Sequence, residues 1–330
     1  MSRPYRILML GTGDFAVPTF RALIDSPHQI LGLYTQPERI GQGHHQSTVH
    51  RIKQLALDRH VPVFQPQSIN TPEVLAELRA HDADLFVVAA YGQILCPELL
   101  TIPKVRAINV HASLLPKYRG ASPIVYSIWK GDLETGVSII EVLPALDAGQ
   151  ILATAKTPIL PEDTAGTLED RLSELGPPLV LRVLDELATG TTHGIPQDPA
   201  LVTRAPKLKK SAGWIDWAQT GFQIDRQVRA MQPWPMPATD LIRPNKPPQR
   251  LLILQIRELP AEEIASRGLP AGVTPGQILP GRKDELLVAS GNGAVEIVRL
   301  QPTGKRPMLA AEFLRGTPVG VECLLRPPQG

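Results

Sequence analysis

Short apolar runs alternate with helical patterns over the first 110 residues, and this alternation limits the possible folds more than any other feature. The runs of strand length are, in chain order, Ile7–Leu10, Gln29–Thr35, Leu85–Ala90 and Ala107–Val110. Helical patterns lie between them at residues 14–26 and 47–59 and from Thr71 onward. Alternation of this kind predicts an α/β domain with an open, mostly parallel sheet of the Rossmann-like type, covered by helices on both faces.

The character of the chain changes after residue 190. Before that point we expect one more strand at 137–143 and a single long helix at 167–187. Residues 191–211 are rich in Thr, Gly, Pro and Lys without periodicity, which is typical of a linker. The apolar runs that follow are separated by Gly, Pro and Asn turns, and they predict a small β-barrel. The expected domains are 1–190, a linker 191–211, a barrel 212–325 and a disordered tail 326–330.

Composition is ordinary for a globular protein, with 43 % hydrophobic and 20 % charged residues in a chain of 330. No apolar run approaches the roughly 20 residues that a membrane-spanning helix needs, and the N-terminus does not resemble a signal peptide. The two cysteines, Cys96 and Cys323, do not form a disulfide framework, and no Cys/His spacing fits zinc. We therefore expect a cytoplasmic protein with no metal and no membrane partner, and the sequence implies no obligate protein partner.

The net charge of +2 hides an asymmetry between the two parts of the chain. Residues 1–203 contain 16 Lys and Arg against 21 Asp and Glu, whereas residues 204–330 contain 18 against 11. A basic second part favours an anionic partner, and nucleic acid is the first candidate. An excess of this size also occurs in proteins that bind no nucleic acid, so both interpretations stay open on charge alone.

The segment Gly11–Ala16 fits the G-x-G-x-x-G/A pattern of dinucleotide-binding turns, because it follows a strand and opens a helix. Asp14, however, would place a carboxylate inside the phosphate cradle. The second strand also ends at Gln36-Pro37 without the acidic residue that binds a ribose. A tight strand-to-helix turn is therefore favoured over a nicotinamide site.

Asn109 and His111 lie two residues apart at the end of a predicted strand, so their side chains point to the same face. The carboxyl ends of strands in open α/β sheets are where ligands bind. Asp147 lies in the loop after the strand at 137–143, within reach of such an edge. An amide donor, an imidazole and a carboxylate suit the attack of an amine on a carbonyl: Asn109 stabilises the oxyanion, His111 moves the proton, and Asp147 orients the ring.

The segment around these residues resembles the folate-dependent formyltransferases. Their N-x-H, S-L-L-P and R-G motifs are matched here by Asn109–His111, Ser113–Pro116 and Arg119–Gly120. Further matches extend to about residue 316; they include Leu146–Gly149, Ala205–Leu208, Ile215–Trp217, Pro233–Pro235 and Leu300–Pro302.

The resemblance implies 10-formyltetrahydrofolate as formyl donor and Asn109, His111 and Asp147 as the catalytic residues. Ser113, Leu114, Leu115 and Pro116 would line the folate site, with the backbone of 90–94 and the loop before Asp147 holding the pterin. Within the family the likeness is to members that formylate the methionine carried by initiator tRNA. The second domain would be an OB-like barrel that contacts this tRNA, with Lys207 on the path.

One loop departs from the family pattern. Residues 40–48 read IGQGHHQST, where the family usually has a cluster of Arg and Lys that enters the tRNA acceptor end. Because histidine gains its charge near pH 6.5, this loop predicts a weaker or pH-sensitive interaction with tRNA; the alternative is a solvated loop that tolerates variation.

Four other functions stay open. An amino sugar as acceptor is the main alternative, and a formyltetrahydrofolate hydrolase, a binding protein without activity and a nicotinamide oxidoreductase are weaker ones.

Overall fold

The computed structural model describes residues 4–38, 50–270 and 272–328, which form two compact units. Unit 1 comprises Met1–Ile124, Glu134–Pro158 and Leu168–Lys207, and unit 2 comprises Val125–Leu133, Ile159–Thr167 and Leu208–Gly330. Unit 1 therefore extends through most of the predicted linker, and two short segments of the predicted first domain group with the second. The predicted loop at 40–48 lies outside the described residues.

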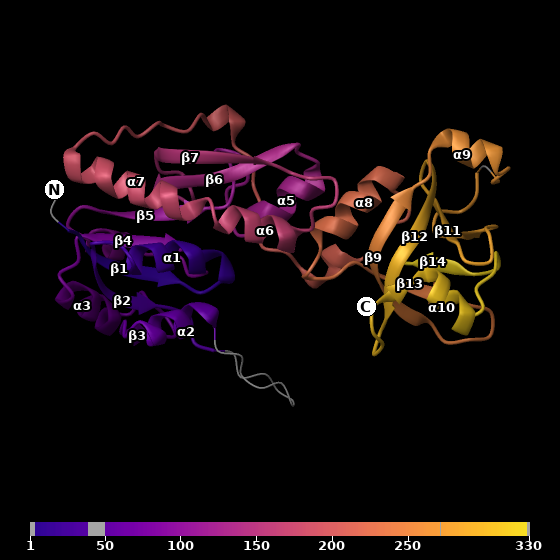
Figure 1. Cartoon of the computed structure of the whole chain (residues 1–330), viewed down its shortest axis with the longest axis horizontal. Helices are drawn as coiled ribbons and strands as arrows, with labels where there is room; N and C mark the ends of the chain where they lie inside the picture. Colours follow the sequence, from indigo (N-terminus) through magenta and orange to yellow (C-terminus); the bar gives the residue numbers. More distant parts are fainter. Residues whose placement is uncertain (1–3, 39–49, 271, 329–330) are drawn as a thin grey trace. The chain divides into compact units, whose positions relative to one another are not determined.

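Unit 1 is built on one seven-stranded sheet with the order β3-β2-β1-β4-β5-β6-β7 (Figure 1). Its strands are β1 (Arg6–Gly11), β2 (Gln29–Tyr34), β3 (Val63–Phe64), β4 (Leu85–Ala89), β5 (Arg106–His111), β6 (Glu134–Glu141) and β7 (Ile151–Pro158). The five strands from β3 to β5 are parallel, whereas β6 runs antiparallel to β5 and β7 runs antiparallel to β6. The mostly parallel Rossmann-like sheet predicted from the alternation is confirmed.

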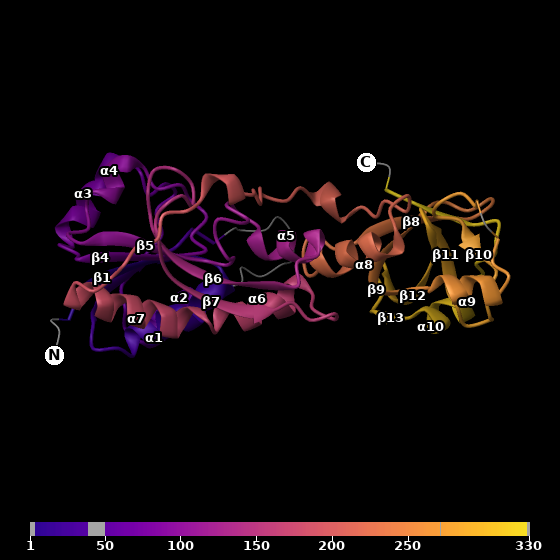
Figure 2. The same ribbon diagram turned by 90° about the horizontal axis from the view of Figure 1, so that it is seen from above.

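Helices cover both faces of this sheet (Figure 2). Those of unit 1 are α1 (Val17–Ile24), α2 (Arg51–Asp58), α3 (Pro72–Ala80), α4 (Pro97–Leu100), α7 (Gly176–Thr189) and the short turns η1 (Asp14–Ala16) and η2 (Pro199–Leu201); α6 (Ala165–Ser173) belongs to both units. The single helix predicted at 167–187 is wrong, because α6 ends at Ser173 and α7 starts at Gly176. Pro177 and Pro178 lack the N–H groups that a continuous helix would need there.

Unit 2 is an antiparallel sheet that curls into a nearly closed barrel, in the order β10-β11-β12-β9-β8-β14. Its strands are β8 (Ala238–Ile242), β9 (Gln249–Glu258), β10 (Ile278–Leu279), β11 (Leu286–Ser290), β12 (Gly293–Pro302), β13 (Met308–Leu309) and β14 (Leu324–Arg326). The two edges meet where Leu325 N–H donates to the Gly276 carbonyl at 2.7 Å. The predicted barrel is confirmed, and Arg326, which we placed in the tail, is the last residue of β14.

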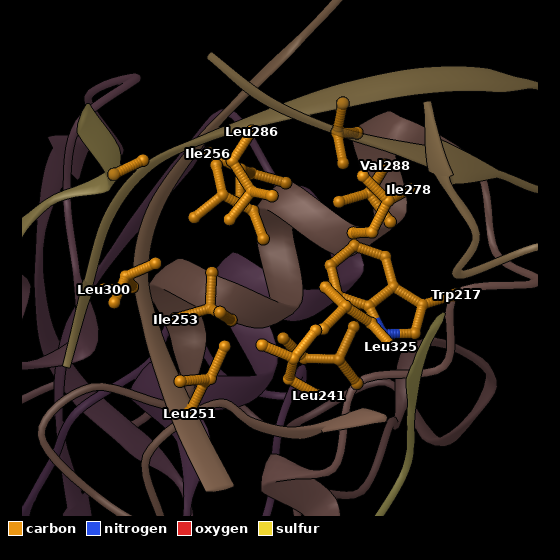
Figure 3. Packing of buried hydrophobic residues seen from close by; sticks show 14 of the residues in the cluster. Trp217, Leu241, Leu251, Ile253, Ile256, Ile278, Leu286, Val288, Leu300 and Leu325 are labelled. Atoms are coloured by element: carbon orange, nitrogen blue, oxygen red, sulfur yellow. The ribbon is translucent and has the colours of Figure 1, made fainter. Parts of the chain in front are cut away.

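The main apolar core of the barrel includes Trp217 (Figure 3), and a smaller cluster of Leu259, Leu279, Leu287, Ala289 and Ala294 lies apart from it. The indole is 2 % exposed, and its Nε1 donates to Thr239 Oγ1 at 3.0 Å, so its one polar atom is satisfied. The helices of this unit are α5 (Pro123–Lys130, of which Pro123 and Ile124 group with unit 1), η3 (Lys210–Gly213), α8 (Gly221–Ala230), α9 (Ala261–Ser266) and α10 (Ala310–Gly316). Of these, α8 buries Ile224 and Val228 in the core.

Candidate active site at the end of strand β5

The register of the sheet fixes Asn109 and His111 at the carboxyl end of β5. Asn109 pairs with Val88 of β4 on one side and Ile140 of β6 on the other, and His111 pairs with Ser138 of β6. Ala107, two residues before Asn109, lies in the apolar cluster that α3 and α4 cover. Asn109 and His111 therefore point to that same face, as the period of a strand predicts.

The ring of His111 is 5 % exposed and has a partner near each nitrogen. Nε2 lies 3.0 Å from the Tyr118 carbonyl oxygen, which only accepts hydrogen bonds, so we assign a proton to Nε2. Nδ1 lies 3.8 Å from Asp147 Oδ1. This separation is too long for a hydrogen bond, but a charged ring would attract the carboxylate across it. The neutral ring therefore keeps its lone pair on Nδ1, where a proton gained would face an acid.

Asp147 reaches this place from the loop after β6. Its Oδ2 accepts a hydrogen bond of 2.8 Å from the Gly120 N–H, and its backbone has a φ of 49°, in the left-handed region that L-residues avoid. Gly149 has no room for a side chain, since a Cβ there would lie 1.8 Å from the Glu141 carbonyl oxygen. The structure therefore brings Asp147 to 3.8 Å from the His111 ring, and the period of β5 places Asn109 on the same face as His111.

Ser113 to Pro116 form the turn that follows β5, but their side chains have different surroundings. Ser113 is fully buried and donates to the Lys117 carbonyl at 2.7 Å, and Leu115 is buried as well. Ser138 supports the turn, because its hydroxyl donates to the Ser113 carbonyl and accepts from the Leu115 N–H. Leu114 and Pro116 are partly exposed. Two of the four residues predicted to bind folate thus support the turn, and the other two have exposed surface.

Exposed apolar side chains lie in the loops that follow β4 and β6, the two neighbours of β5. Ile94 is 79 % exposed in the first loop, and Leu143 and Leu146 are 43 % and 56 % exposed in the second. The first loop is anchored at Tyr91, whose carbonyl accepts from Gln36 Nε2 and Thr12 Oγ1. Burial raises the pKa of the Tyr91 phenol, so this side chain stays neutral. Apolar surface beside polar groups is typical of a site for a flat ring system.

The turn Gly11–Ala16 has the structure of a packing turn. The N–H groups of Thr12 and Gly13 both point at the Ala90 carbonyl, so they are not free to hold a phosphate. A Cβ on Gly11 would lie 2.6 Å from the Phe20 ring, which explains this glycine without a ligand. The structure thus supports the tight turn that the sequence favoured.

Two residues that support the trio were not found from the sequence. Ser138 looked like one more residue of a strand, and Gln197 lies in the segment interpreted as a linker. Gln197 Nε2 donates to the carbonyls of Asp147 and Gly149, both at 2.8 Å. A glutamine at the middle of a segment without periodicity carries no local signal, because its partners lie far away in the sequence.

Along the described part of the chain, none of the helices combines the length and the apolar content that crossing a bilayer requires. Within the same residues, no three His, Cys, Asp or Glu side chains gather into a set that could hold a metal ion.

Comparison with known proteins places the chain among enzymes of one kind. The model of the formyl transferase family matches residues 5–184, and that of the formyl transferase C-terminal domain matches 207–318. The methionyl-tRNA formyltransferase of Hydrogenovibrio crunogenus is 40 % identical over 313 residues, which covers 95 % of this chain and 96 % of that one.

Two solved structures share the fold. An N-formyltransferase from Helicobacter canadensis, crystallised with folinic acid and dTDP-3-aminofucose, has a TM-score of 0.60 at 16 % identity and covers 91 % of this chain and 100 % of that one. HypX from Aquifex aeolicus in complex with tetrahydrofolic acid has a TM-score of 0.59 at 17 % identity. The match covers 94 % of this chain, which spans about half the length of HypX (47 %). From the family models and the full-length relative, we conclude that the chain belongs to the formyl transferase family, in its methionyl-tRNA formyltransferase branch.

Proposed function

We propose that the protein transfers the formyl group of 10-formyltetrahydrofolate to the α-amine of methionyl initiator tRNA, giving N-formylmethionyl-tRNA for translation initiation. The observation that carries this proposal is the likeness to a methionyl-tRNA formyltransferase over nearly the full length of both chains. The convergence of Asn109, His111 and Asp147 at one strand end supports it, because these groups suit acyl transfer to an amine.

In the proposed reaction the methionyl nitrogen attacks the formyl carbon and forms a new C–N bond. The carbonyl oxygen becomes an oxyanion, which the Asn109 amide stabilises; one such donor contributes about 3–4 kcal/mol. The intermediate collapses when the bond between the carbon and folate N10 breaks. One amine proton passes to N10, and the products are the formamide and tetrahydrofolate.

His111 carries this proton in the proposed mechanism. Nε2 is already engaged with the Tyr118 carbonyl, so Nδ1 is the nitrogen that accepts and returns it. Asp147, 3.8 Å from Nδ1, stabilises the ring while it is charged. General acid–base catalysis of this kind accelerates reactions by roughly 10²–10⁴-fold.

For the donor we propose the turn after β5 and its apolar neighbours. Leu114 and Pro116 are partly exposed, and Ile94, Leu143 and Leu146 expose apolar surface on the flanking loops. Ser113 and Leu115 would act through the shape of the turn, because both are buried. A pterin ring that covers these side chains would remove their apolar surface from water, which favours binding by about 25 cal/mol per Å².

For the acceptor we propose that the second unit binds the tRNA. Residues 204–330 have a net excess of positive charge, which suits a polyanion and predicts binding that weakens with salt. Lys207, at the end of unit 1, is exposed and would contribute to the same interaction.

The acceptor is tested by offering the purified protein several amines with 10-formyltetrahydrofolate. We expect rapid formylation of methionyl initiator tRNA, slow formylation of methionyl elongator tRNA, and none of a dTDP-linked amino sugar. Formylation of the sugar without formylation of tRNA would replace the proposal by its main alternative. The amino sugar is included because the N-formyltransferase crystallised with dTDP-3-aminofucose shares the fold, and a likeness at 16 % identity does not indicate which acceptor this chain uses.

A further inference from the structure

Gln197 has an unusually complete set of hydrogen bonds for a residue between α7 and η2. Its Nε2 donates to the carbonyl oxygens of Asp147 and Gly149, both at 2.8 Å. Its Oε1 accepts from Nε and Nη2 of Arg119, at 3.0 and 2.8 Å. Both amide hydrogens and the carbonyl oxygen are therefore used, which fixes the orientation of the side chain.

These bonds close a ring around Asp147. Gly120 holds the carboxylate from one side through its N–H, and Gln197 holds the backbone of the same residue from the other. Arg119, the neighbour of Gly120, binds Gln197 and so joins the two sides. The backbone of Asp147 has a φ of 49°, a left-handed conformation that costs free energy and persists only where surrounding contacts fix it. The loop thus depends on these contacts for the position of its acid.

The segment that carries Gln197 is itself anchored at both ends. Ile195 exchanges two backbone hydrogen bonds of 2.9 Å with Ile151 of β7. Farther along, Thr203 Oγ1 accepts from the Tyr118 N–H at 2.9 Å, and the Thr203 carbonyl accepts from the Arg119 N–H at 2.9 Å. Tyr118 is the residue whose carbonyl meets His111 Nε2. One segment therefore supports the partners of both ring nitrogens.

We propose that Gln197 is a positioning residue for the formyl transfer, which holds the Asp147 carboxylate beside Nδ1 of His111. It contacts no reacting atom in this role and acts through the loop. This inference rests on the proposed function, since positioning matters only if the trio performs the reaction.

The sharpest test is Gln197→Glu. The new carboxylate still accepts from Arg119, but it can donate to neither carbonyl and repels both. We expect kcat for methionyl initiator tRNA to fall about 10–100-fold with KM for tRNA within about twofold, because the acid moves while the second unit, proposed to bind the tRNA, is unchanged. Gln197→Met, which keeps the length and loses every hydrogen bond, should fall at least as far.

A matched control exists at the opposite end of the strands. Gln29, the first residue of β2, also accepts from an arginine, since Arg6 Nη1 donates to its Oε1 at 3.2 Å. Gln29→Glu makes the same chemical change in the same unit and should leave kcat within about twofold of the wild type. Thermal melting of each variant verifies that the protein is folded.

Hydrogen exchange supplies a readout that does not depend on activity. In substrate-free Gln197→Glu we expect faster exchange in the peptide covering 142–150 and at the Gly120 amide, with no change in Gln29→Glu. Faster exchange with unchanged kcat, a change in KM alone, or unchanged exchange and kcat would each overturn the positioning role. A wild-type protein that cannot formylate methionyl-tRNA would refute the proposed function, whereas the exchange data would still show whether Gln197 holds the loop.

Discussion

Asn109 and His111 reach the site from a strand, whereas Asp147 reaches it from a loop, and different interactions hold the two. The strand pair is fixed by backbone pairing with β4 and β6. The acid is fixed by a few hydrogen bonds, from Gly120, 27 positions away, and Gln197, 50 positions away. A strand register resists single substitutions because many backbone hydrogen bonds maintain it, whereas a loop that is fixed by a few side-chain hydrogen bonds is more sensitive to the loss of one. We therefore expect the strand pair to be robust in position and the acid to be sensitive to its neighbours.

The largest expected effect is on kcat, in a variant that removes a catalytic group from β5 without changing the position of the strand. Asn109→Ala removes the proposed oxyanion donor while the register of β5 remains, so kcat should fall about 10²–10³-fold with little change in melting temperature. Single-turnover formylation and thermal melting measure the two quantities. A rate near that of the wild type would exclude Asn109 as the donor.

A smaller effect is expected when the loop keeps its hydrogen bonds and loses only its charge. In Asp147→Asn the amide oxygen can still accept from Gly120, but the attraction across 3.8 Å to a charged His111 ring disappears. At an effective dielectric constant of about 20 this attraction amounts to a few kcal/mol, and we expect kcat to fall roughly 10–100-fold. If Asp147→Asn were as slow as Asp147→Ala, the charge of the carboxylate, rather than its hydrogen-bonded position, would account for most of the loss in kcat.

The smallest effect concerns stability rather than rate. Ser138→Ala leaves the buried Ser113 carbonyl and the Leu115 N–H without the hydroxyl that pairs with both. We expect the free energy of unfolding to fall by about 1–3 kcal/mol, measured by urea denaturation. An unchanged unfolding free energy would show that the turn after β5 does not need this support.

The same contrast explains what the sequence could predict. Apolar runs such as Leu85–Ala90 encode a buried strand locally, and the parallel order of strands follows from the helices between them. Asn109 and His111 share one face because side chains alternate along a strand, and their spacing of two residues can be read from the sequence. Asp147 could be placed near them only because it follows the next strand along the chain.

The features that the sequence missed depend on partners far along the chain. β7 was not predicted, because its run Ala153–Lys156 includes exposed residues and short side chains without a clear apolar alternation. The segment 191–205 looked like a linker, yet Thr203 and Gln197 bind loops more than 45 residues away. Local composition cannot reveal hydrogen bonds of that kind. The roles of the site residues and the domain limits stay predictions.

The most direct test of the account follows the formyl group itself in a single turnover on methionyl initiator tRNA, with wild-type protein and with His111→Ala. We predict that the wild type converts the bound tRNA to the formylated product and that His111→Ala, with folate still bound, does so at least about 10²-fold more slowly. Equal rates in the two proteins would contradict the claim that the site at the end of β5 carries out the transfer.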